Sequence, residues 1–287
     1  MSNDILNSHP CFSTHCQPTT GRIHLPVAPS CNIFCRFCSR GLTTKINRPG
    51  QAAKVLTPEQ ALGVVEAALL LCPELRVVGI AGPGDPLASA EALDTLILIK
   101  EKYPQLINCL STNGLSLASS MERIMAAKIQ TITVTVNAVK PVILESLNRG
   151  VLVKGSFIGG LSGASLLIEA QERGIRLAHE NHLIIKVNTV LVPGINDGHI
   201  GEVAEKVKSW GADILNVIPL IPANELAHIQ APTDEDKKRA DQEAGKYLPV
   251  KYNCRRCRAD ACGIPGVSEY SQELYKDLGE VETFSHG

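Results

Sequence analysis

Six short apolar runs rich in β-branched residues alternate with amphipathic stretches along this chain. The pattern predicts strands over residues 24–28, 76–81, 106–111, 131–136, 182–190 and 213–219, and helices over 57–71, 88–103, 117–127, 165–173 and 197–210. Parallel strands need crossovers of the length that a helix supplies, so the alternation favours βα units. Because six strands are too few for a closed eight-stranded barrel, we expect an α/β fold with a partial, open (βα)6 barrel.

The loops after these strands carry small and polar residues, at the edge where such folds place their chemistry. Gly, Pro and Asn are also ordinary turn residues, so one such loop alone would mean little. Their repetition on the edge that also carries thiols indicates a polar ligand near the carboxyl ends of the strands. The candidate binding residues are Gly82, Gly84, Asp85, Ser111, Asn113, Asn137 and Asn188.

Three thiols, Cys31, Cys35 and Cys38, lie within eight residues after the first predicted strand. A structural zinc site needs four ligands, and the next dozen residues contain no Cys or His to complete one. On a four-iron cluster, three thiolates leave one iron open to a chelating substrate, and a tight loop with this spacing can reach three irons. The spacing therefore favours an iron–sulfur cluster over structural zinc.

Composition excludes several classes of partner. The formal net charge is -1 and no run of Lys and Arg forms a stripe for phosphates, so we expect no nucleic-acid partner. No stretch of about 18 apolar residues occurs and the polar N-terminus has no apolar export segment, so we expect a cytoplasmic protein with no membrane partner. In a reducing compartment the ten cysteines favour metal ligation over disulfides, although Cys72, before a Pro, is predicted to be a buried apolar side chain.

The loop with Cys31, Cys35 and Cys38 resembles the radical S-adenosylmethionine (AdoMet) superfamily. The resemblance implies a TIM-like partial barrel and a catalytic cluster on these three thiols, whose open iron is chelated by AdoMet. One electron then cleaves AdoMet to methionine and a 5′-deoxyadenosyl radical. In that superfamily a glycine-rich loop after the second strand binds the AdoMet amino group, and Gly82-Pro-Gly-Asp85 occupies that place.

A narrower resemblance, to the NifB family, covers residues 10–263. This family builds the carbide-containing iron–sulfur precursor of the nitrogenase cofactor. The chain is similar to the short form of the family, without an appended carrier domain. The matching blocks stand in family order: His9-Pro-Cys-Phe-Ser, Gly21-Arg-Ile-His, Arg48-Pro-Gly, Gly79-Ile-Ala-Gly-Pro-Gly-Asp-Pro, Leu110-Ser-Thr-Asn-Gly, Lys186-Val-Asn-Thr-Val and Cys254-Arg-Arg-Cys-Arg-Ala-Asp.

The NifB resemblance also implies two further four-iron clusters, which are the substrates that become fused. Their ligands match Cys11, His24, Cys109, Cys254 and Cys257. Without the resemblance, a histidine on an apolar strand, such as His24, is more often a core residue. A single Cys-x2-Cys pair is typical of either half a zinc site or free thiols.

One family ligand is absent from this chain. The family has a further Cys soon after the AdoMet motif and an Asn-Glu before Arg-Pro-Gly, whereas residues 39–47, which include Thr43 and Thr44, contain neither Cys nor Glu. Cys16 and Cys262 are the thiols available to replace it. We expect Cys16 to do so, because it belongs to the same N-terminal arm as Cys11.

The implied activity is that of a methyl-transferring lyase that uses AdoMet twice. One molecule donates a methyl group to a substrate cluster, and a second provides the radical that removes hydrogen from it. Fusion of the two [4Fe-4S] clusters, with a carbide and a sulfide, gives the eight-iron precursor called NifB-co. The cofactors implied are the [4Fe-4S] cluster that binds AdoMet, and AdoMet itself.

The resemblance further implies a monomer that works with an iron–sulfur cluster donor, an electron donor and a cofactor carrier protein. We expect an N-terminal arm over residues 1–23, the barrel over 24–225, and a C-terminal helix and thiol tail over 226–287. Two alternatives remain open. The missing Cys and Glu are compatible with a radical enzyme that acts on another substrate, and the thiols themselves are compatible with a cluster carrier without AdoMet chemistry.

Overall fold

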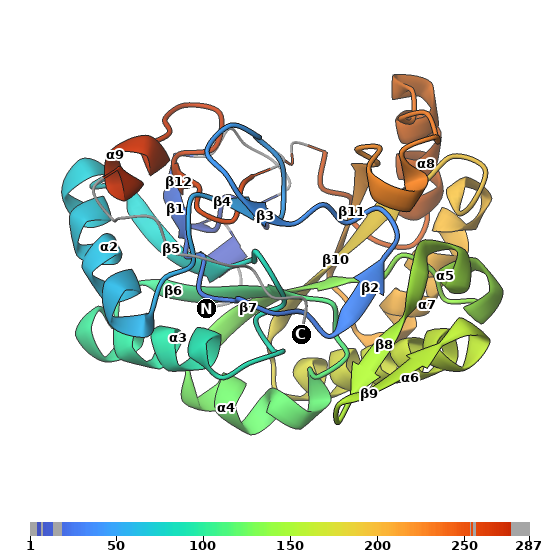
Figure 1. Ribbon diagram of the computed structural model, residues 1–287, viewed down its shortest axis with the longest axis horizontal. Helices are drawn as coiled ribbons and strands as arrows, with labels where there is room; N and C mark the ends of the chain where they lie inside the picture. Colours follow the sequence, from blue (N-terminus) through green and yellow to red (C-terminus); the bar gives the residue numbers. More distant parts are fainter. Residues whose placement is uncertain (1–4, 7, 14–18, 253, 255–256, 277–287) are drawn as a thin grey trace.

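The computed structural model describes residues 5–6, 8–13, 19–252, 254 and 257–276. Its main sheet has seven strands in the order β11-β10-β7-β6-β5-β1-β12, of which all but β12 run parallel. Among the described residues β11 and β12 do not pair, so the curled sheet stays open (Figure 1). The predicted partial barrel of six parallel strands is confirmed. The strands are β1 Gly21–His24, β5 Leu75–Ile80, β6 Ile107–Thr112, β7 Ile129–Thr135, β10 Ile184–Leu191, β11 Ile214–Pro219 and β12 Cys262–Gly263.

The first strand lies earlier in the sequence than predicted, at Gly21–His24 instead of residues 24–28. Pro26 has no N–H to donate, so a regular ladder does not continue through it. The chain still follows β5 at first, because the N–H of Leu25 donates to the carbonyl of Gly79 at 2.9 Å. Leu25 and Val27 are fully buried, so the apolar run predicted burial correctly but not the strand pairing.

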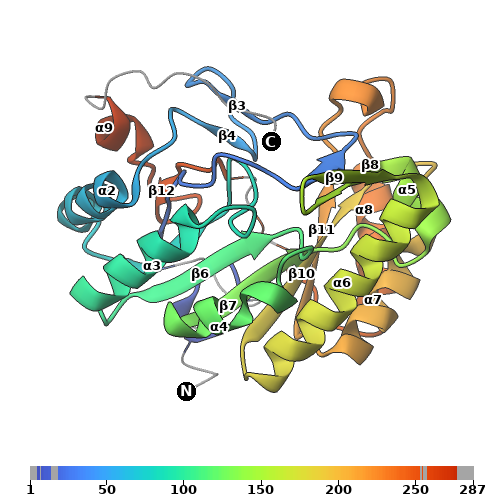
Figure 2. The ribbon, with the colours of Figure 1, turned by 60° about the horizontal axis from the view of Figure 1, so that its bottom comes forward.

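Helices cover the outer face of the sheet (Figure 2). The predicted start of the first of them is confirmed, since Thr57 and Gln60 form a capping box and Pro58 occupies the first helical position. The acidic and basic run near residue 240 forms a helix with its own capping box at Thr233. No described helix is long and apolar enough to span a membrane. The helices are α2 Pro58–Leu71, α3 Glu91–Lys102, α4 Met121–Ala126, α5 Pro141–Leu147, α6 Gly160–Glu180, α7 Ile200–Trp210, α8 Asp234–Gly245 and α9 Ser271–Tyr275, with 3-10 turns at Ala118–Ser120, Asp197–His199 and Asn224–Leu226.

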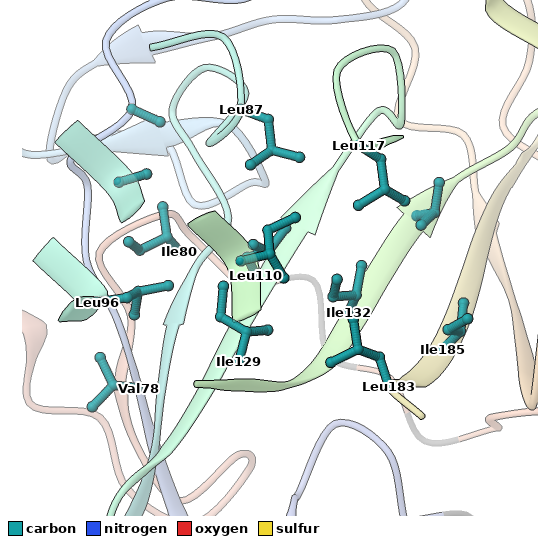
Figure 3. Close-up of a cluster of buried hydrophobic side chains, with 14 of the residues drawn as sticks. Val78, Ile80, Leu87, Leu96, Leu110, Leu117, Ile129, Ile132, Leu183 and Ile185 are labelled. Carbon is teal, nitrogen blue, oxygen red and sulfur yellow. The ribbon is translucent and has the colours of Figure 1, made fainter. Parts of the chain in front are cut away.

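Side chains along each strand alternate between two faces of the sheet. One set packs against the helices and forms the main core, which includes Ile80, Leu110 and Ile132 (Figure 3). Burying a side chain of this size contributes about 1.5–3 kcal/mol. The alternate set faces the inside of the curled sheet. There, Cys109 and other strand residues form a separate apolar cluster with Phe12 of the N-terminal segment. The inner face is therefore closed at one point by the N-terminal segment.

A β-hairpin that the sequence pattern does not predict lies against the thiol loop. Residues 148–163 form β8 Asn148–Val153, β9 Ser156–Gly159 and the beginning of α6. β8 pairs antiparallel with β2 Ile33–Cys35, which carries one of the three thiols. Gly163 permits close packing of α6 on the hairpin, because a Cβ there would lie 2.2 Å from the carbonyl oxygen of Ile158. A second small pair, β3 Gly41–Leu42 and β4 Gln51–Ala52, follows the thiols.

Candidate active site

The three thiols lie on one loop that backbone hydrogen bonds hold in place. The N–H of Phe34 donates to Oδ1 of Asn148 at 3.0 Å, and the N–H of Arg36 donates to the carbonyl of Leu147 at 2.9 Å. The N–H of Cys38 donates to the carbonyl of Cys35 at 3.2 Å. The hairpin therefore determines the path of the loop, and it leaves all three thiols partly exposed.

Burial raises the pKa of each of these thiols. It raises the pKa of Cys31 to about 11, with a further contribution from the Asp85 carboxylate, and that of Cys35 well above its ordinary value, with contributions from Cys38 and Cys31. Burial also raises the pKa of Cys38, while Arg40 acts in the opposite direction. Three neighbouring thiols that resist ionisation fit a cationic iron cluster, because bound metal supplies the positive charge that stabilises thiolates.

The arrangement differs from a site for a single metal ion. Among the described residues, no three Cys, His, Asp or Glu side chains converge closely enough to hold one ion. A four-iron cluster requires a wider spacing of its ligands, since each of the three thiolates binds a different iron.

The glycine-rich loop after β5 packs directly on the thiol loop. The N–H of Gly84 donates to the carbonyl of Ala28 and that of Asp85 donates to the carbonyl of Ser30, both at 2.7 Å. A Cβ on Gly84 would lie 1.9 Å from the carbonyl oxygen of Ser30, so only glycine allows this approach. Gly82, one of the residues with positive φ, precedes it in the same loop.

Asp85 is buried and links the loop after β5 to the loop after β6. Its carboxylate accepts hydrogen bonds from Oγ1 of Thr112 at 2.9 Å and from the N–H of Asn113 at 2.6 Å. Asn113 then donates from Nδ2 to Oδ1 of Asn32 at 2.7 Å, and the same nitrogen lies 3.8 Å from Sγ of Cys31. Burial raises the pKa of Asp85, whereas these donors lower it. This chain of contacts fixes three loops relative to one thiol.

The other predicted binding residues have different surroundings. Asn137 is buried, and its Oδ1 accepts from the N–H of Val190 at 2.9 Å, so it joins the ends of β7 and β10. Oδ1 of Asn188 accepts from Nδ2 of Asn216 at 3.0 Å. Ser111 is partly exposed on β6, two residues beyond Cys109 and thus on the same face of the strand.

A second group of predicted ligands gathers on the inner face of the sheet. His24 on β1 and Cys109 on β6 flank Gly79 of β5, because a Cβ on Gly79 would lie 3.3 Å from Cδ2 of His24 and 3.8 Å from Cβ of Cys109. Cys11 packs into the apolar cluster that contains Cys109. The structure thus brings together residues that are far apart in the sequence.

Burial also controls the charge of these groups. It raises the pKa of Cys109 to about 12 and lowers that of His24 to about 3, so the imidazole is neutral at neutral pH. Nδ1 of His24 lies 3.1 Å from the carbonyl oxygen of Arg258. A carbonyl only accepts, so this contact places the proton on Nδ1 and leaves the lone pair on Nε2, the form that binds metals.

The thiols of the C-terminal Cys-x2-Cys pair also lie near this group. Burial raises the pKa of Cys11, the thiols of Cys257 and Cys254 raise it further, and Lys186 and Arg22 oppose these effects. Cys257 accepts a hydrogen bond from Nη2 of Arg22 at 3.1 Å, whereas Cys254 is exposed.

Arg258, in the motif with the Cys-x2-Cys pair, binds residues 39–47, the segment that contains no Cys. Arg258 pairs with Asp260 at 2.8 Å and donates from Nη2 to the carbonyl of Thr43 at 2.8 Å. Cys262, which follows, is fully buried in the main core between sheet and helices, beside Cys72, which is buried as predicted. Cys262 therefore lies on the opposite face of the sheet from His24 and Cys109. Cys16 lies outside the described residues.

Sequence reasoning missed several polar residues that surround the inner group. Lys186 donates from Nζ to the carbonyl of Cys11 at 2.9 Å, and Lys251 donates to the carbonyl of Pro10 at 3.2 Å, so two buried lysines hold the arm that carries Cys11. His9 is buried, and its Nε2 has no hydrogen-bond partner among the described residues. A lysine within the apolar run of β10 was the available signal for Lys186.

Comparisons with known proteins identify relatives of this chain. The Radical SAM superfamily description matches residues 25–207. The FeMo cofactor biosynthesis protein NifB of Methanocaldococcus infernus is 44% identical over 95% of this chain and 91% of its own length. That of Methanocaldococcus jannaschii is 42% identical over 98% of this chain and 96% of its own length. That of Azotobacter vinelandii is 36% identical over 91% of this chain but only 53% of its own length.

Two solved structures share the fold. A radical SAM methyltransferase from Sphaerobacter thermophilus aligns with a TM-score of 0.57 at 21% identity, over 81% of this chain and 66% of its own. SuiB from Streptococcus suis, bound to S-adenosylmethionine, aligns with a TM-score of 0.57 at 16% identity, over 90% of this chain and 53% of its own. From the matched superfamily description and the relatives of similar length, the chain is a radical SAM enzyme that belongs to the NifB family.

Proposed function

We propose that this enzyme is a radical SAM maturase of FeMo cofactor biosynthesis. It fuses two [4Fe-4S] clusters, with an AdoMet-derived carbide and a sulfide, into the eight-iron precursor NifB-co. The observation that carries the proposal is the presence of two groups of candidate metal ligands in one half-barrel, the three thiols at the carboxyl ends of the strands and Cys109 with His24 on the inner face. A radical enzyme that acts on iron–sulfur substrates needs both.

Cys31, Cys35 and Cys38 hold the catalytic [4Fe-4S] cluster, and AdoMet binds beside it. When bound, the cluster supplies the electron that cleaves AdoMet. Ser111, Asn188 and the backbone of Gly82 contact AdoMet, because Ser111 is partly exposed on the inner face and the amide nitrogen of Asn188 donates to no acceptor among the described residues. Gly84, Asp85, Asn113 and Asn137 position the loops, since their polar groups already bond within the protein.

The two substrate clusters bind to the inner group, with Cys11, His24, Cys109, Cys254 and Cys257 as ligands and Cys16 in place of the absent family Cys. His9 joins this group, because a buried imidazole nitrogen without a partner is costly unless something binds it. The buried cations Lys186, Lys251 and Arg22 offset the negative charge of sulfide-rich substrates. The surrounding sheet limits access of water, so a radical reacts with the substrate.

We further infer the organisation of the chain and its partners. Residues 1–23 act as a ligand-bearing arm, 24–225 as the radical SAM barrel and 226–287 as a C-terminal helix and thiol tail. The enzyme works as a cytoplasmic monomer with a cluster donor, an electron donor and a carrier that accepts the product. Its clustered free thiols support a reducing compartment.

An anaerobic assay with dithionite, AdoMet and reconstituted enzyme tests the proposal. We expect 5′-deoxyadenosine and S-adenosylhomocysteine together, and a product that activates apo-nitrogenase. The absence of 5′-deoxyadenosine would leave only the cluster-carrier function.

One observation favours a second candidate. The segment with Thr43 and Thr44 lacks the family Cys, so this segment supplies no thiol to a substrate cluster. A radical enzyme with another substrate would form 5′-deoxyadenosine in the same assay without S-adenosylhomocysteine and without an eight-iron product.

A further inference from the structure

Basic residues are concentrated in the two segments beside the three thiols. Residues 32–58 and 146–168 contain seven Lys or Arg and no Asp or Glu, in a chain whose formal net charge is -1. Charge of one sign gathered in one region produces a local field that a neutral average conceals. The seven residues are Arg36, Arg40, Lys45, Arg48, Lys54, Arg149 and Lys154.

Acidic groups from neighbouring elements offset only part of this charge. Glu225 forms ion pairs with both Arg36 and Arg149, the latter at 3.1 Å, so one carboxylate serves two guanidinium groups. The backbone carbonyl of Glu145 accepts from Nε of Arg36 at 3.2 Å. The carboxylate of Glu145 also lies beside the hairpin, because a Cβ on Gly160 would lie 3.5 Å from its Oε1. Lys154 is exposed at the turn between β8 and β9 and adds a further positive charge. Arg36, Arg149 and Lys154 outnumber the carboxylates of Glu225 and Glu145, so a small excess of positive charge remains on this face.

An exposed aromatic pair lies among these cations. Phe157 on β9 is 57% exposed, and its ring packs edge-on against Phe34 of β2 with centroids 5.4 Å apart. The ring also lies over two glycines, because a Cβ on Gly150 would lie 2.7 Å from Cζ of Phe157 and one on Gly159 would lie 2.9 Å from Cε1. The phenyl group is thus held in position while much of it faces solvent. Rigid aromatic and Arg side chains of this kind are typical of protein interfaces.

This face adjoins the catalytic thiols without lying inside the barrel. Phe34 directly precedes Cys35, and the same strand pairs with β8 of the hairpin. Figure 2 shows β2, β8 and β9 together outside the main sheet. A protein bound here would approach the cluster from outside, opposite to the substrate group on the inner face.

We propose that Phe34, Arg36, Arg149, Lys154 and Phe157, the aromatic–basic face, dock an acidic one-electron carrier protein. The inference rests on the radical chemistry of the proposed function, which consumes one electron for each AdoMet cleaved. The carrier loses one electron and the cluster on the three thiols gains it, and no other group is oxidised or reduced. A small face with a charged border suits a carrier that must bind and leave quickly.

The test uses the reconstituted holoenzyme and a reduced acidic flavodoxin as the probe. In Lys154→Glu and in Phe157→Ala, we expect the Kd and the KM for flavodoxin to rise about tenfold at low salt, with a weaker salt dependence for Lys154→Glu. Formation of 5′-deoxyadenosine with dithionite, a small reductant that needs no docking, stays at the wild-type rate in both variants. Lys206→Glu, an exposed position on α7, is the matched control and leaves all three quantities unchanged.

The proposal is overturned if flavodoxin binds both variants as tightly as the wild type. It is also overturned if Lys206→Glu raises the Kd for flavodoxin as much as the two variants do. Failure of the wild type to bind the acidic carrier at low salt overturns it as well. A wild-type enzyme that fails to cleave AdoMet with dithionite contradicts the proposed function instead, and the Kd still reports on docking.

Discussion

Arg22 donates a hydrogen bond from Nη2 to Sγ of Cys257 at 3.1 Å, although the two residues are 235 positions apart. The same guanidinium donates from Nη1 to the carbonyl of Gly263 at 2.9 Å. Arg22 is buried on β1, so the first strand of the barrel holds the C-terminal tail by one cation. A hydrogen bond from a charged guanidinium is stronger than one from a neutral donor, so it fixes the position of this sulfur.

Arg22→Gln is therefore expected to lower iron binding at the inner group but not at the three thiols of the loop. The measurement is iron per chain after anaerobic reconstitution, together with the reduction potentials of the clusters. Loss of the bonds to Cys257 and Gly263 should also cost about 1–3 kcal/mol of unfolding free energy. Arg76→Gln removes an exposed arginine that contacts only local carbonyls, and equal iron loss there would contradict the role of Arg22.

Gly84→Ala tests the contact between the glycine-rich loop and the thiol loop. The added Cβ would lie 1.9 Å from the carbonyl oxygen of Ser30, so one of the loops must move. We expect a loss of about 1–3 kcal/mol in stability and slower dithionite-driven cleavage of AdoMet. Gly63→Ala is the control, since its Cβ meets no atom within 4 Å and lies in a helix, where Ala stabilises by about 0.5–1 kcal/mol. Normal stability and activity of Gly84→Ala would refute the contact.

The stability of the metal-free protein should depend on pH through His24. Burial, together with the nearby charge of Arg22, lowers its pKa to about 3, whereas the unfolded chain titrates near the ordinary value of about 6.5. Between these values the unfolded state binds more protons, so His24 destabilises the fold progressively as the pH falls from about 6.5 toward 3. Denaturant unfolding of His24→Gln should show a smaller decrease in unfolding free energy over this pH range than the wild type. His9 acts in the same direction, so the loss is reduced and not abolished.

His228→Gln provides the control for this pH dependence, because His228 is exposed. The unfolding free energy of His228→Gln should decrease as the pH falls, as it does in the wild type. If the two histidine variants behave alike, the buried state of His24 is not the cause.

Cys16→Ala should lower the iron content after reconstitution, because Cys16 is the proposed substitute for the absent family ligand. Cys262→Ala should leave the iron content unchanged, since Cys262 is buried in the main core and not on the inner face. Unchanged iron content in Cys16→Ala would refute the proposed replacement of the absent ligand by Cys16. A loss of iron in Cys262→Ala alone would assign that role to Cys262 instead.

The fold was predictable where one face of an element is apolar. The apolar runs that form β5, β6, β7, β10 and β11 are buried against helices. They could be identified because such runs alternate along the sequence with segments of helical periodicity. Pro26 moved the first strand, because the same apolar run can be buried without forming a ladder. The hairpin over residues 148–159 escaped prediction because its glycines serve close packing, which leaves no periodic signal.

The site was predictable in its thiols but not in its supporting contacts. Spacing alone identified Cys31, Cys35 and Cys38 as one group. The bonds from Arg22 to Cys257 and from Lys186 to the carbonyl of Cys11 join residues that only the fold brings together. Asp85 was expected to contact a ligand, but its hydrogen bonds from Thr112 and Asn113 could not be predicted, because they depend on the position of two neighbouring strands.

The most direct measurement of the central claim follows the methyl carbon of AdoMet. Reconstituted enzyme is given AdoMet with a ¹³C-labelled methyl group and dithionite, and the iron–sulfur product is isolated and its carbon detected. The account predicts the label inside an eight-iron product, with release of S-adenosylhomocysteine and 5′-deoxyadenosine. Formation of 5′-deoxyadenosine with no label in any iron–sulfur product would contradict it.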